Sequence, residues 1–135
     1  MTSTADLLAA ISAHLAAVEL PEIASVRVEA SPPGPPVTVQ LPHHGPTTLA
    51  HGLLAWAGTL TEITAQAWRV PAGDSVHLSV TGRLPGGSAV RVYGGMRLTP
   101  HGPGADLAPG ASAALPLAAL RSLAAPGGLT EEAAL

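Results

Sequence analysis

The stretch that decides the fold runs from Pro46 to Tyr93. It opens with PTTLAHGLLAWAG (46–58) and continues with three shorter runs, LTEITAQAWRV (60–70), SVHLSVTGRL (75–84) and SAVRVYGG (88–95). In the first segment Leu49, Leu53 and Trp56 recur at i, i+4 and i+7, which is the spacing of a buried helical face. This segment therefore predicts a helix with Trp56 in the core.

The three runs after this helix alternate apolar and polar residues. In the second run Val76, Leu78 and Val80 share one parity and polar side chains share the other. Period two over three consecutive runs is typical of an antiparallel sheet that is covered on one side only. Trp68 has the parity of Gln66, so we expect Trp68 on the uncovered side, where its loss should change stability little.

The rest of the chain completes one domain and a tail. Apolar spacing predicts a helix over 3–18, and alternation predicts strands over 25–30 and 37–41. From Thr99 onward the composition shifts to Pro, Gly and Ala, which favours a flexible, linker-like tail with a short helix over 116–125. We therefore predict a single α+β domain over 1–98, in the order α-β-β-α-β-β-β, with helices on one face of a mainly antiparallel sheet. The tail, 99–135, should be dispensable for folding.

Composition limits the classes of function. The chain has 135 residues and no cysteine, which excludes disulfides, thiol catalysis and thiolate metal sites. Its net charge of −3 argues against a dedicated nucleic-acid binder. No run approaches the roughly 20 apolar residues of a membrane span, so we expect a cytoplasmic protein that does not enter the membrane.

The histidines are the first place to look for chemistry. His43 and His44 precede the central helix and His51 lies within it, but no carboxylate is near them in sequence. Metal sites of this kind usually include one, so we expect neither a metal nor another cofactor. An alternative is a small-molecule or enzymatic pocket between helix and sheet that uses His51 or His77.

The outward parity of the sheet gathers a more unusual set of side chains. They are Trp68, Tyr93, Arg91, Arg27, Arg83, His77, Gln66 and Glu62. Trp, Tyr and Arg are enriched in the energetic centres of protein interfaces. We expect a binding site formed by Trp68, Arg91, Tyr93, His77, Arg83 and Gln66, with no catalytic residue, for a protein partner or a second copy of the chain.

Two alternatives for this face stay open. One is that the tail helix folds back over the face through Leu117, Leu120 and Leu123. The other is that Trp68 and Tyr93 act as stacking platforms for single-stranded nucleic acid, against which the acidic net charge counts.

Two segments also carry a resemblance to known sequences. The helix ending in LLAWAG (53–58) and the strand ending in RVYGG (91–95) lie within residues 7–98, which resemble short uncharacterised proteins of actinobacteria, some of them carried near mobile elements. The resemblance implies no activity.

Overall fold

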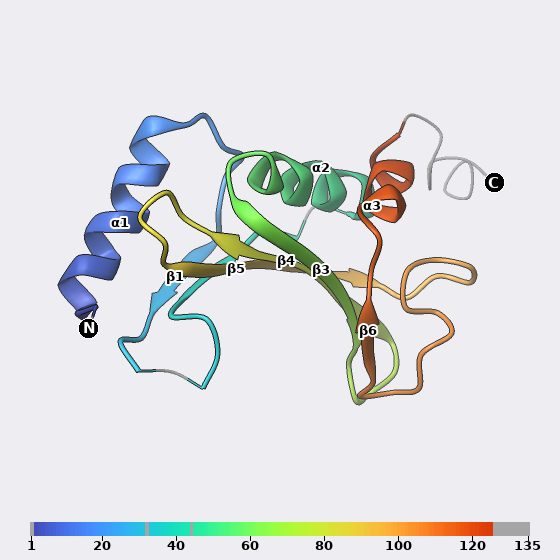
Figure 1. Ribbon diagram of the computed structural model, residues 1–135. Coiled ribbons are helices and arrows are strands. Elements are labelled where there is room, and N and C mark those ends of the chain that lie inside the picture. Colours follow the sequence, from blue (N-terminus) through green and yellow to red (C-terminus); the bar gives the residue numbers. More distant parts are fainter. Residues whose placement is uncertain (1, 32, 44, 126–135) are drawn as a thin grey trace.

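Six strands form one open sheet, and the helices lie on one of its faces (Figure 1). The computed structural model describes residues 2–31, 33–43 and 45–125. The helices are α1 (Thr4–Ala17), α2 (Pro46–Ala57) and α3 (Leu117–Ala124). The strands are β1 (Ser25–Val28), β2 (Val37–Gln40), β3 (Thr61–Arg69), β4 (Ser75–Arg83), β5 (Ala89–Arg97) and β6 (Ser112–Ala114). The predicted α+β class, with helices on one face of a mainly antiparallel sheet, is confirmed.

The strand order is β1-β2-β5-β4-β3-β6. The predicted meander of β3, β4 and β5 is present, and β1 and β2 form a second antiparallel pair. These two units meet where β2 pairs with β5, and this pairing is parallel. A parallel pair requires a long connection, which here contains α2, β3 and β4. Residues about fifty positions apart in sequence thereby become neighbours at the centre of the sheet.

The core lies between the helices and the sheet. Leu49, Leu53 and Trp56 of α2 are buried, with Trp56 and Leu53 at 0% exposure, so the predicted helical stripe and the core position of Trp56 are confirmed. On the sheet, the buried residues of β5 alternate as expected, and those of β4 do so except for Ser79, which is buried although it has the outward parity. Gly94 of β5 faces α2, and a Cβ there would overlap the Leu49 side chain. Glycine at this position allows the helix to approach the strand closely.

α1 begins with a capping box, in which the Ser3 side chain accepts from the Asp6 backbone N–H and the Asp6 side chain accepts from Ser3. Its buried side includes His14, a residue that the hydrophobic pattern did not single out. The His14 Nε2 lies 2.9 Å from the Thr59 hydroxyl, which donates to the Trp56 carbonyl at 2.8 Å.

None of the helices in the described ranges has the length and apolar character that crossing a membrane requires.

Residues 99–125 differ from the linker-like tail that composition predicts. β6, which the sequence analysis did not predict, pairs with β3 and forms an edge of the sheet. The expected short helix is present as α3, and it packs on α2 with Leu120 and Leu123 buried. α3 therefore lies on the same side of the sheet as α2 (Figure 1), and the alternative in which it covers the outward face is wrong. The rest of the expected tail, 126–135, lies outside the described residues.

Candidate functional site

The side of the sheet opposite the helices is the candidate site, and we call it the open face (Figure 1). Strand pairing arranges its side chains in rows that run across the strands. One row is Arg27, Thr38, Arg91, Thr81 and Thr64, from β1 to β3. A second contains Gln40, Tyr93, Ser79 and Gln66, and a third contains Gly95, His77, Trp68 and Ser112. Neighbours within a row are separated by one strand spacing, about 4.8 Å.

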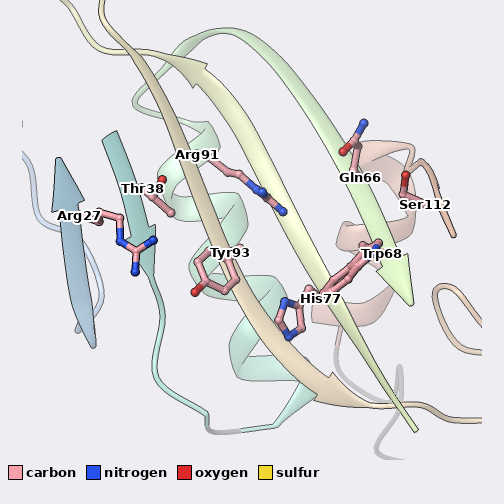
Figure 2. Close-up of a pocket in the computed structure, with 8 residues that line it drawn as sticks. All are labelled: Arg27, Thr38, Gln66, Trp68, His77, Arg91, Tyr93 and Ser112. Carbon is pink, nitrogen blue, oxygen red and sulfur yellow. The ribbon is translucent and has the colours of Figure 1, made fainter. Parts of the chain in front are cut away.

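A shallow hollow of about 460 Å³ lies across these rows. Figure 2 shows its lining, which includes five of the six predicted binding residues: Gln66, Trp68, His77, Arg91 and Tyr93. Arg27, Thr38 and Ser112 complete it. The structure thus brings together side chains from β1, β2, β3, β4, β5 and β6. Trp68 is half-buried and Gln66 exposed, which confirms the predicted register of β3.

Arg83, the sixth predicted residue, lies away from this hollow. It is at the end of β4, where its guanidinium pairs with Glu62 and donates to the Gly87 carbonyl at 2.8 Å. Its partners belong to the turn after β4 and to the start of β3. We therefore assign Arg83 to the support of a turn and leave it out of the candidate site.

The aromatic rings of the hollow form a continuous row of contacts, from Trp68 through His77 to Tyr93. Trp68 meets His77 edge-on with 5.1 Å between ring centroids, and His77 stacks against Tyr93 at 5.5 Å (Figure 2). The Arg91 guanidinium carbon lies 5.6 Å from the Tyr93 ring centroid. Trp68 is also held by a hydrogen bond of 3.3 Å from its Nε1 to the Gly110 carbonyl. Mutual contact restricts the rotamers of these side chains, so a ligand would meet a partly ordered surface.

Gly95 contributes to the hollow by having no side chain. It is the partner of His77 across β4 and β5. A Cβ at this position would lie 3.4 Å from the His77 ring, so any longer side chain would occupy the space beside the imidazole. Glycine here keeps one side of the His77 ring accessible.

The charge of the hollow is positive. Its lining contains two arginines and no carboxylate. Burial lowers the pKa of His77 below its ordinary value, and the positive charge of Arg91 lowers it further. The imidazole is therefore held in its neutral form, in which one ring nitrogen donates and the other accepts.

A pH dependence of stability follows from His77 and from the buried His14, whose pKa is also lowered by burial. Because the unfolded chain binds these protons more readily, the stabilisation is complete above pH 6.5 and is lost as the pH falls through the lower folded-state values. We expect the urea midpoint to fall between pH 7.5 and pH 5. His14→Gln/His77→Gln should flatten this fall, whereas His51→Gln, at an exposed position of α2, should leave it unchanged. An equally steep fall in the double variant would contradict the assignment.

Of the other histidines that the sequence analysis considers, His43 lies near His77 and His51 does not. His43 lines a second hollow of about 330 Å³, which adjoins the first through His77 and Tyr93. His51 is exposed on α2, on the other side of the sheet from His77. His44 lies outside the described residues. Within the described part of the chain, no three histidine or carboxylate side chains are grouped as metal ligands would be.

Three residues that line the hollow, Thr38, Ser112 and Arg27, are not among the binding residues predicted from the sequence. Thr38 has the outward parity of its strand, but its place beside Arg91 depends on the parallel pairing of β2 with β5. Ser112 belongs to β6, in a stretch without a strand-like pattern. Arg27 has the outward parity but is not among the six predicted binding residues, and its position across Thr38 from Arg91 also follows from strand order.

Comparisons with protein-family models, with curated proteins and with solved structures give no match.

Proposed function

We propose that this protein is a non-catalytic binding module that holds a protein partner on the open face of its sheet. The observation that carries the proposal is the convergence of Trp68, His77, Arg91 and Tyr93 on one hollow of about 460 Å³. These side chains come from three strands, and they include both aromatic residues that lie outside the central helix. In a chain with only 2% aromatic residues, such a concentration favours a recognition surface.

The composition of the hollow supports recognition. Trp, Tyr and Arg combine a large apolar contact area with a polar end, and they account for much of the energy in protein interfaces. Trp68 is pre-positioned by its contacts with His77 and Gly110, so binding would cost less side-chain entropy than it would for a freely rotating ring. The lining is half-exposed, which suits a flat or extended protein surface better than an enclosed small molecule.

The test compares two double variants of the full chain. Trp68→Ala/Arg91→Ala removes the two proposed anchors. Leu8→Ala/Arg121→Ala is the matched control, since Leu8 and Arg121 are exposed on α1 and α3, away from the open face. We expect the first variant to lose partner capture from native cytosol by roughly thirtyfold or more per anchor, if each contributes about 2 kcal/mol. The control should retain capture.

Two further measurements check that the variants are folded and identify the captured partner. Circular dichroism and the unfolding midpoint should be nearly unchanged in both variants, because neither Trp68 nor Arg91 belongs to the buried core. Sedimentation velocity should report whether the captured partner is a second copy of the chain. Equal capture by the two variants, with both folded, would refute the open face as the binding surface.

A further inference from the structure

The hollow contains a pair of arginines with a threonine between them. Arg27 on β1 pairs with Thr38 on β2, and Thr38 pairs with Arg91 on β5. The two arginine Cα atoms are thus about 10 Å apart, two strand spacings of about 4.8 Å each. Both side chains and the Thr38 hydroxyl line the same hollow (Figure 2). The row therefore places two guanidinium groups and one hydroxyl along one hollow, with the Arg91 guanidinium directed away from Arg27 and toward the Trp68 side (Figure 2).

In the part of the chain that the structure describes, the Arg91 guanidinium has no hydrogen bond or salt bridge, unlike two of the other arginines. Arg69 donates to the carbonyls of Gly73 and Leu107 at 2.7–3.1 Å. Arg83 has Glu62 and the Gly87 carbonyl. Among the described residues, Arg91 has neither a hydrogen-bond acceptor nor a carboxylate, and its contact is with the Tyr93 ring. Its five N–H donors are available to a ligand.

The Arg27 guanidinium takes part in only a weak, solvent-exposed salt bridge. Among the described residues it pairs with the Glu29 carboxylate at 4.0 Å, and the Arg27 and Glu29 side chains are 78% and 50% exposed. Exposed pairs of this kind contribute about 0–1 kcal/mol. A carboxylate from a ligand would replace Glu29 at little cost.

The positive charge of the hollow indicates what kind of partner it can bind. If two copies of the chain met open face to open face, the same patch would lie on both sides, so two hollows that each contain two arginines and no carboxylate would meet. Like charges in contact across an interface disfavour association. The face instead complements a surface that supplies negative charge.

We propose that the open face binds an extended acidic protein segment, with its carboxylates on Arg91 and Arg27 over Thr38 and an apolar side chain beside Trp68. This proposal rests on the proposed function and names its partner class. A guanidinium pairs with a carboxylate through two parallel hydrogen bonds, which Arg91 has free. In an extended segment every second side chain points the same way, so alternating acidic residues would reach the sheet together.

Nucleic acid fits the same surface less well. A polyphosphate backbone requires a row of cations, and the hollow offers two, in a chain of net charge −3. The Tyr93 ring already contacts His77 and Arg91, so it is not freely available for stacking with a base. A short acidic segment needs only the two arginines that are present.

The experiment uses the full chain and three probes. They are an acetylated and amidated hexapeptide, Glu-Ser-Glu-Ser-Val-Ser, whose two Glu and one Val point the same way when it is extended, its counterpart with Gln in place of Glu, and a ten-residue oligothymidylate. The first two are called the Glu/Val and Gln/Val peptides. Each is titrated to millimolar concentration while NMR follows the Trp68 indole N–H. We expect the Glu/Val peptide to bind at least tenfold more tightly than the Gln/Val peptide, with an affinity that falls as salt is added.

Two variants connect the affinity to the site. Arg91→Gln should weaken Glu/Val binding by tenfold or more, whereas Arg121→Gln, on the exposed side of α3, should not. Equal binding of the two peptides, or no binding of either, would overturn the proposal of an acidic partner. The binding-module proposal would still be decided separately, by the partner-capture assay. If oligothymidylate bound more tightly than the Glu/Val peptide, and Arg91→Gln abolished that binding, the ligand of the open face would be single-stranded nucleic acid and not an acidic segment.

Discussion

Trp56→Ala should lower the free energy of unfolding by roughly 3–5 kcal/mol, as large-to-small changes in a core do. Trp56 is fully buried between the helices and the sheet, and its ring lies 5.7 Å from that of His14. A chain without phenylalanine has no other residue of this size in its core. Urea unfolding at pH 7.5 measures the change, because His14 and His77 are then mainly neutral in both the folded and the unfolded chain.

Trp56→Phe separates the volume of the ring from its N–H group. The Trp56 Nε1 is buried without a hydrogen-bond partner among the described residues. Removing an unsatisfied donor recovers part of the free energy that the smaller ring loses, so Trp56→Phe should cost much less than Trp56→Ala. Trp68→Ala is the control on the open face and should change stability little. A cost for Trp68→Ala equal to that of Trp56→Ala would contradict the observed register.

A chain that ends at Leu98 should be strongly destabilised or fail to fold, which reverses the expectation from composition. The truncation removes β6 from the edge of β3 and α3 from α2. It also removes the Leu107 carbonyl, which accepts from Arg69 at 2.7 Å. The loss exposes core side chains that contact α3, and fully burying a leucine contributes about 1.5–3 kcal/mol. Circular dichroism and the thermal midpoint measure the effect.

Point variants test the same contact without truncation. Leu120→Ala/Leu123→Ala should cost about 2 kcal/mol or more per leucine, because both side chains are buried against α2. Ser122→Ala, on the exposed side of the same helix, should have little effect. A truncated chain with an unchanged midpoint would show that α3 contributes nothing to the core.

Much of the candidate site is predictable from local pattern. Strands have a period of two, and a sheet with one buried face puts every residue of one parity on the other face. This rule is sufficient to place Trp68, His77, Arg91 and Tyr93 together on the open face, since their strands are consecutive and joined by short turns. It cannot exclude Arg83, whose parity is the same, because parity does not report how far along the strand a side chain lies.

The sequence by itself determined the helices, the meander, the buried position of Trp56 and the outward set of aromatic residues, because each of these depends on periodicity within one continuous segment. The tertiary structure decided the rest. Arg27 and Thr38 join the site through the parallel pairing of β2 with β5, and Ser112 joins it through β6. The burial of His14 depends on Trp56 and Thr59, more than forty residues away. Contacts between distant segments are selected by the packing of the whole chain, and no local pattern encodes them.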